Sequence, residues 1–194
     1  MPQQDIPHNA QLINQKIDKI KYRLLAGLFL IPVFLLIFTA FYLKYITQGK
    51  ILFEHINIPI IVAISLFNLF PHEFFHLVGF TKNNRVYVWI YPRKIAVFVY
   101  PEFPLSRERF MWSCMLPGLT LSVVPLFVWV LIGSGLLAEI LFLFAVINLG
   151  SSAGDFLCTW VASKLPKQSH IQFQGLNWYW FPKEAKVCKY PTTN

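Results

Sequence analysis

The sequence predicts an all-α polytopic membrane protein with about four transmembrane helices and a small cytoplasmic β-hairpin. Of its 194 residues, 56% are hydrophobic and only 13% are charged, whereas a soluble domain usually carries nearly twice that charged fraction. Four apolar stretches are each long enough to cross a bilayer. These observations exclude an ordinary soluble domain, and we expect a single membrane domain over residues 1–194.

The expected spans follow one another along the chain. The first covers about Leu24 to Leu43 and holds no charged residue, and the second begins near Ile56 and ends at Phe80. The third covers about Phe110 to Ile132, where Pro117-Gly118 indicates an irregular helix. A tight turn then leads into the fourth span, from about Leu136 to Ser163.

Lysines and arginines orient these spans. They concentrate in residues 1–23, 81–109 and 164–194, whereas only Lys44 and Lys50 lie between the first and second spans. The positive-inside rule therefore places both termini and the 81–109 segment in the cytoplasm. We expect an integral protein of the lipid bilayer, in a bacterial cell membrane. The net charge of +8 follows this topology, so we expect no nucleic-acid partner.

The 81–109 segment contains two strand-like runs. Arg85 to Tyr91 and Ile95 to Tyr100 are rich in β-branched and aromatic residues, and Pro92-Arg93-Lys94 separates them. This pattern predicts a β-hairpin at the cytoplasmic interface. The simpler interpretation is an aromatic anchor at the membrane surface. The alternative is an exposed edge that pairs with an extended substrate peptide.

The second span contains an H-E-x-x-H sequence, His72-Glu73-Phe74-Phe75-His76. Two imidazoles four residues apart lie on one face of a helix, where both can bind one zinc ion. The glutamate between them is placed to accept a proton from a water at that metal. Because ionisable groups at membrane depth are costly, their presence favours a functional site.

Asp155 is the expected third ligand. It is the only charged residue between Glu139 and Lys164, and an isolated carboxylate there should cost about 3 kcal/mol. No lysine or arginine within the predicted spans can neutralise it. At about 1.5 Å rise per residue, His76 and Asp155 lie about 9 and 14 Å from the cytoplasmic ends of their spans, which is one level within the uncertainty of the boundaries. The alternative is a hydrogen-bonded helix-packing residue, or a carboxylate close enough to the membrane interface to be hydrated.

Asn148 lies seven residues before Asp155 and therefore on the same helical face. It is a candidate catalytic group that would steady an oxyanion. An interhelical hydrogen bond is an equally good interpretation.

The chain resembles the DUF3267 family of zincin peptidases, which is similar to the site-2-type intramembrane zinc metalloproteases. The resemblance covers roughly residues 70–181. It implies that His72 and His76 bind zinc, that Glu73 is the general base and that Asp155 is the third ligand. Site-2 proteases take this aspartate from an Asn…Asp-Gly pattern, whereas here the glycine precedes the aspartate. These motifs carry the resemblance: the H-E-x-x-H sequence, the strand-rich segment after it, Leu116-Pro117-Gly118, Asn148 to Asp155, and the tail from Lys164 through His170 to Trp180.

The expected function is therefore that of an intramembrane zinc metalloprotease, with Zn²⁺ as cofactor and a membrane protein or peptide as substrate. The alternative is a non-catalytic zinc-binding membrane scaffold, sensor or transport component. Glu73 separates the two, because structural zinc binding needs no general base. A metal-free hydrogen-bonded core is a third interpretation. The sequence names neither the substrate nor the oligomeric state.

Overall fold

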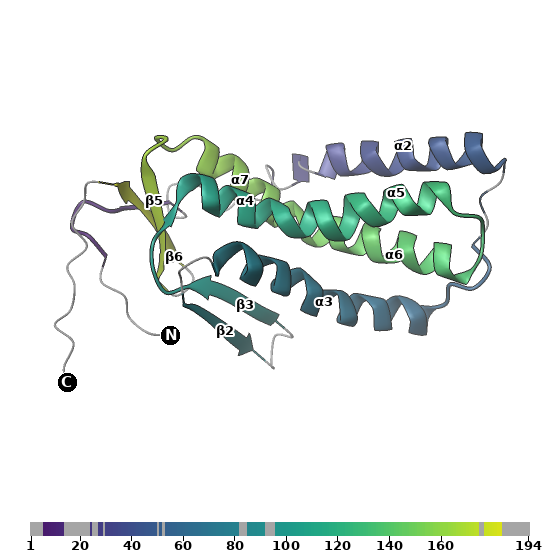
Figure 1. The fold of residues 1–194 in the computed structure, drawn as a ribbon, viewed down its shortest axis with the longest axis horizontal. Coiled ribbons are helices and arrows are strands. Elements are labelled where there is room, and N and C mark those ends of the chain that lie inside the picture. The colour runs from purple at the N-terminus through teal and green to yellow at the C-terminus, as the bar shows by residue number, and fades with distance from the viewer. Residues whose placement is uncertain are drawn as a thin grey trace.

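The structure, a computed structural model, is an elongated helical bundle with its strands gathered near one end (Figure 1). We call this the sheet end, and the opposite end, where α2 connects to α3 and α5 to α6, the loop end. The structure describes residues 6–13, 24, 27–28, 30–49, 51, 53–81, 85–91, 96–174 and 177–183.

Three helical segments of the described chain are long and apolar enough to cross a membrane, and a bent pair makes a fourth. They are α2 (Leu30–Gln48), α3 (Ile58–Phe80), the continuous run of α4 (Arg107–Gly118), the π-helix η2 (Leu119–Val123) and α5 (Val124–Leu131), and the pair α6 (Leu136–Ser151) and α7 (Ala153–Ser163). The predicted fold class is confirmed, and so is the irregularity of the third span, where the π-helix directly follows Pro117-Gly118.

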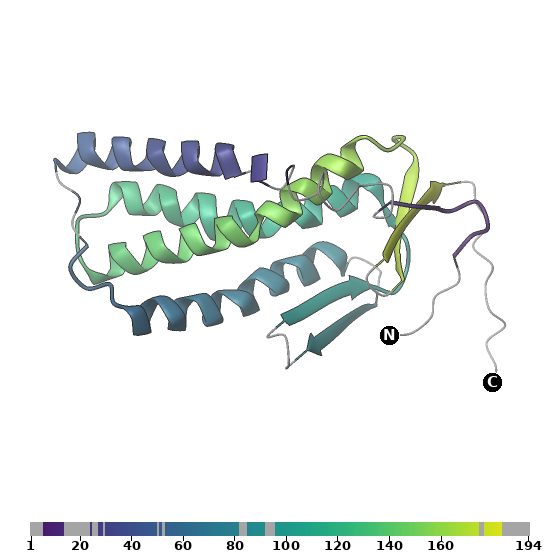
Figure 2. The ribbon, with the colours of Figure 1, turned by 180° about the vertical axis from the view of Figure 1, so that it is seen from behind.

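Two predicted spans differ from the structure in detail. The first extends beyond Leu43 to Gln48 and so includes Lys44, although no basic residue was expected inside a span. The fourth is broken at Ser152, where α6 and α7 bend by 42° (Figure 2). The break lies in a run of small residues, Gly150-Ser151-Ser152-Ala153-Gly154, which we expected to continue one helix.

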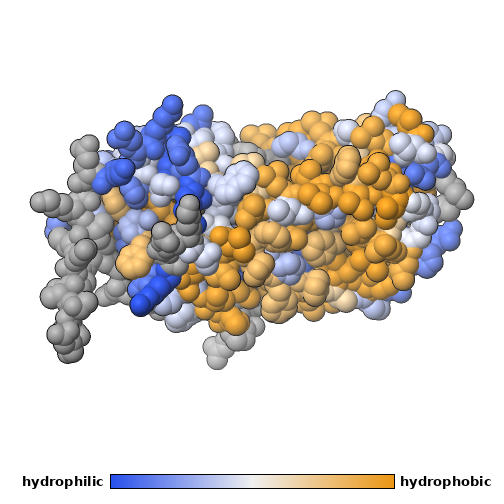
Figure 3. Space-filling model, in the orientation of Figure 1, coloured by the Kyte–Doolittle hydropathy of each residue, from blue (hydrophilic) through white to orange (hydrophobic). Residues whose placement is uncertain are grey.

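Local signals explain where the helices start. The side chain of Asn57 accepts a hydrogen bond from the Ile60 N–H, and a proline lies in the first turn of α3. Ser106 caps α4 in the same way through the Arg109 N–H. Along the helices, large apolar side chains face outward, for example Phe38 at 71% exposure. They form an apolar band between hydrophilic ends (Figure 3), which is the surface a bilayer requires.

The predicted hairpin is confirmed. β2 (Val86–Tyr91) and β3 (Ala96–Pro101) pair antiparallel over six residues each, with Val88 opposite Val99 and Ile90 opposite Val97. The expected turn at Pro92-Arg93-Lys94 lies outside the described residues.

A second sheet lies at the same end and was not predicted. Its strand order is β1-β6-β5-β4, from β1 (Gln11–Leu12), β6 (Asn177–Pro182), β5 (Ser169–Gln174) and β4 (Leu105–Ser106). The described part of the expected tail therefore forms strands that pack against the helices. Ile171 and Phe181 are almost fully buried, and Ile171 joins Phe110 and Leu157 in the core of this end.

Candidate metal centre

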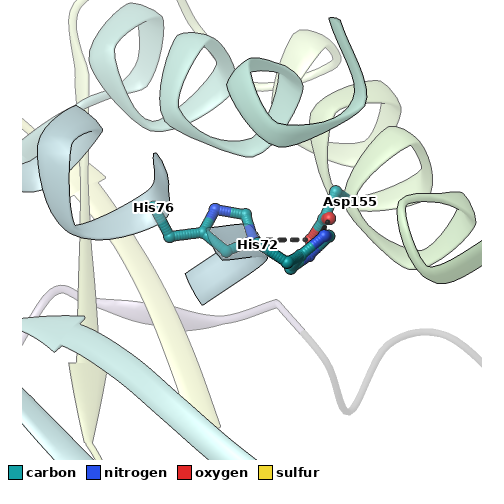
Figure 4. A group of neighbouring side chains, drawn as sticks. All are labelled: His72, His76 and Asp155. Atoms are coloured by element: carbon teal, nitrogen blue, oxygen red, sulfur yellow. Dashed lines mark ion pairs between the residues drawn. The ribbon is translucent and has the colours of Figure 1, made fainter. Parts of the chain in front are cut away.

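His72, His76 and Asp155 lie together between the helices (Figure 4). The histidines come from α3 and the aspartate from the first turn of α7. Nε2 of His72 is 3.2 Å from Asp155 Oδ2, and Nε2 of His76 is 3.4 Å from Asp155 Oδ1. The structure thus brings together three residues that the sequence placed on two separate spans.

Helix α4 positions the two ligand-bearing helices, because it packs against both α3 and α7. Its contact with α3 is closest at Gly79, where an added Cβ would lie 2.4 Å from the Cβ of Ser113 and 2.8 Å from its Cα. Only glycine allows this approach. Gly79 lies less than one helical turn from His76, and the imidazole of His76 can therefore reach the α4 backbone.

The protonation of His76 follows from this contact. Its Nδ1 is 3.0 Å from the carbonyl oxygen of Ser113. A carbonyl only accepts hydrogen bonds, so Nδ1 carries the proton. In the neutral ring, Nε2 then presents its lone pair toward Asp155.

Asn148 fixes His72 in the same way. Its Nδ2 lies 3.0 Å from the carbonyl oxygen of Pro117 and 2.7 Å from Ser122 Oγ, which identifies Nδ2 as the donor side of the amide. The Oδ1 atom therefore accepts from His72 Nδ1 at 2.9 Å, and His72 Nε2 also presents a lone pair. Since both N–H groups of the fully buried Asn148 are directed at these partners, it has no donor left for the expected oxyanion role. It orients the His72 ring instead.

These donors fit a metal ion. Two imidazole lone pairs directed at a carboxylate repel it unless a cation lies between them. Asp155 Oδ2 is buried, and because Nδ1 of His72 carries the ring proton, the 3.2 Å approach of Nε2 to this oxygen is an ion pair only if the ring gains a second proton. Ligands held tetrahedrally at about 2.0–2.1 Å from zinc are about 3.4 Å apart, close to both distances here. Two nitrogens and one oxygen would leave the fourth zinc position open.

Glu73 is partly buried beside this group, where its carboxylate interacts electrostatically with both histidines and Asp155. The backbone N–H of Val99 in β3 donates a hydrogen bond to it. The hairpin and the H-E-x-x-H helix are therefore in direct contact at the glutamate.

The residues that orient the ligands were missed from the sequence. They are the Ser113 and Pro117 carbonyls, the Ser122 hydroxyl and the Val99 amide. Most of these are backbone groups, which nearly every residue has, so the residue types do not show which of them take part. The available signal was Leu116-Pro117-Gly118, because a proline inside a helix always leaves one carbonyl without its helical donor.

The fold and the site together define a helical protein with candidate membrane spans and a buried His-His-Asp group that can hold a metal. Residues 65–170, more than half of the chain, match the family DUF3267, described as "Putative zincin peptidase". The chain belongs to this family, as the sequence resemblance predicted. The matched segment contains all three residues of the group and Glu73. No curated protein and no solved structure matches the chain.

Proposed function

We propose that this protein is an intramembrane zinc metalloprotease that hydrolyses peptide bonds of membrane-associated substrates. The observation that carries the proposal is the position of the Nε2 atoms of His72 and His76, 3.2 and 3.4 Å from the oxygens of Asp155. Both converge on the Asp155 carboxylate within an apolar band of helices. Family membership supports a peptidase, and the apolar surface supports a membrane location.

His72, His76 and Asp155 would hold the metal. Zinc bound there would supply a Lewis acid that acidifies a water and polarises the scissile carbonyl. Glu73 would accept the proton of the attacking water and return it to the leaving amine. One hydrogen bond from Val99 orients this carboxylate and leaves it further acceptor capacity for the water.

The site is proposed to face the cytoplasm. Six described basic residues lie at the sheet end, where the positive-inside rule expects the cytoplasmic face: Arg85, Arg107, Arg109, Lys164, Lys167 and Lys183. At the loop end, the described lysine is Lys44, whose ammonium is bonded to helix carbonyls. The two histidines lie in the C-terminal half of α3, which leads into β2 at the sheet end, so substrates would be cut in the cytoplasmic half of the bilayer.

The edge of β3 that faces away from β2 is the proposed receiver of the substrate. The Glu102 N–H bonds to the Arg85 carbonyl, so alternation along the ladder directs the backbone groups of Val97 and Val99 away from β2. The Val99 N–H indeed reaches Glu73 on this outer side. An extended peptide paired with this edge would carry its scissile bond past the general base.

Removing one backbone donor tests this receiver. Val97→Pro deletes an outward N–H without breaking a bond to β2, and it is expected to raise the KM for a peptide substrate. Ile90→Pro, opposite Val97 in the register, deletes the equivalent N–H on the outer edge of β2 and should leave KM unchanged. Equal effects of both variants would reject β3 as the receiver.

The glutamate provides the main test. Glu73→Gln should retain zinc and lose cleavage by about 10²–10⁴-fold, so uncut peptides should accumulate in the membrane proteome. Glu108→Gln makes the same change at a residue of the α4 first turn, away from the metal group, and should cleave normally. Full biological activity of Glu73→Gln would instead favour the zinc-binding scaffold, sensor or transport component. Absence of zinc from purified, reconstituted protein would reject both functions.

A further inference from the structure

The Leu116-Pro117-Gly118 motif lies in α4 beside the metal group but contributes no ligand. We infer that Pro117 and Gly118 are the positioning element of the metal centre and set the orientation of all three ligands. This inference rests on the zinc site of the proposed function. Neither residue has a side chain that can bind a metal, so both would act through the backbone.

The first contact depends on the backbone N–H that Pro117 lacks. In a continuous α-helix, the carbonyl of Ser113 accepts from the N–H of the residue four positions later. That residue is Pro117, which has no N–H. The carbonyl is thereby free to accept from His76 Nδ1 at 3.0 Å, and this bond holds the imidazole with Nε2 toward Asp155.

The second contact is made by the carbonyl of Pro117 itself. It accepts from Asn148 Nδ2 at 3.0 Å, and Asn148 accepts from His72 at 2.9 Å. The π-helix η2 begins two residues after Pro117, and such widened turns interrupt regular helix bonding. The carbonyl of Ser113 therefore orients His76, and the carbonyl of Pro117 orients His72 through Asn148.

The third contact is made by Gly118. A Cβ at this position would lie 2.7 Å from Phe156 Cζ and 3.3 Å from the Cβ of Ser152. The absence of that atom lets the start of α7 lie against α4. Asp155 is the residue next to Phe156, so the same close approach sets how far its carboxylate reaches toward α3.

Another proline of the same helical run provides a matched comparison. Pro125 lies in the first turn of α5, directly after the π-helix η2, so the carbonyl that it leaves without a helical donor belongs to η2, four or five residues earlier. The hydrogen bonds that orient the two histidines do not involve this carbonyl. Pro125→Ala thus changes the same chemical group in the same span without a link to a ligand.

The experiment compares Pro117→Ala with Pro125→Ala in purified full-length protein. Zinc affinity is measured by chelator competition, ligand geometry by the absorption spectrum of the cobalt-substituted protein, and stability by thermal unfolding without metal. Pro117→Ala is expected to bind zinc about 10–100-fold more weakly and to alter the cobalt spectrum. Its metal-free melting temperature should not fall, since alanine favours a helix more than proline does. Pro125→Ala should keep the wild-type affinity and spectrum.

A second variant keeps the test decisive if Pro117→Ala folds poorly. Gly118→Ala should weaken zinc binding, and Phe156→Leu in the same chain should restore it by removing the atom that clashes. Wild-type affinity and spectrum in Pro117→Ala would overturn the inference, and so would equal losses in Pro117→Ala and Pro125→Ala. If the wild-type protein binds zinc but the variants do not change zinc binding as expected, the positioning role is rejected and the proposed function still stands. If wild type binds none, the proposed function fails as well.

Discussion

The ammonium nitrogen of Lys44 lies 2.7 Å from the carbonyl oxygen of Trp129 and 2.7 Å from that of Ile132. A charge only 2% exposed thus joins α2 to the C-terminal end of α5, where helix carbonyls have no backbone donor.

Lys44→Met should therefore destabilise the bundle. It leaves two carbonyls without their donor, which costs about 1–3 kcal/mol each when buried. The measurement is the free energy of unfolding in mixed micelles. Lys164→Met, at an exposed residue, should change it by less than about 0.5 kcal/mol. Similar losses in the two variants would mean that the Lys44 bonds do not stabilise the fold.

Gly79→Ala should destabilise the protein by overpacking. The new Cβ would lie 2.4 Å from the Cβ of Ser113, so α3 and α4 must separate, at a cost of about 1–3 kcal/mol. Gly154→Ala places a methyl group in open space and should be neutral or stabilising by up to about 1 kcal/mol. Thermal unfolding of both variants checks this, and a stable Gly79→Ala would argue against the close helix contact.

Asn148→Ala should weaken zinc binding about 10–100-fold, because it removes the acceptor that keeps the proton of His72 on Nδ1. Chelator competition measures the change. Ser151→Ala, at an exposed residue of the same helix whose hydroxyl bonds the Ile147 carbonyl, is the control and should bind zinc normally. Unchanged affinity in Asn148→Ala would show that the amide does not orient the ligand.

The stability of the protein should depend on pH because His55 and Glu139 form an ion pair at the loop end. The hydrogen bond between the ring of His55 and the Glu139 carboxylate, 2.9 Å long, raises the pKa of His55 above 6.5. The protonated ring therefore favours the folded state. This stabilisation is fully present below about pH 6.5 and is lost as the pH rises through the raised folded-state pKa.

The melting temperature should accordingly fall as the pH is raised from about 6 toward 9. His55→Gln should remove this part of the slope, and Glu139→Gln should remove it too, since the carboxylate partner is lost. A slope that persists in both variants would place its origin elsewhere in the molecule.

The grouping of His72, His76 and Asp155 was predictable because it depends on side chains and periodicity. The four-residue spacing of His72 and His76 fixes their face, and the lone charge of Asp155 at a similar depth requires a partner. Lys44 was expected outside the first span. A buried ammonium is tolerated where helix carbonyls lack a backbone donor, and the sequence does not show which helix ends lie together.

The tail strands could have been predicted. Ser169–Gln174 and Asn177–Pro182 are short runs containing β-branched or aromatic residues, and two residues separate them, a spacing typical of hairpins. Their pairing with β1 and β4 could not, because it joins segments from both ends of the chain.

The position of α4 between α3 and α7 has a consequence for the whole molecule. His76 and Asp155 are 79 residues apart in the chain (155 minus 76), so an ion held by both would act as a cross-link that closes a long loop. Loading with metal would then tighten the bundle around the His-His-Asp group, and chelation would loosen it. Protease resistance and melting temperature should both follow the occupancy of a single ion.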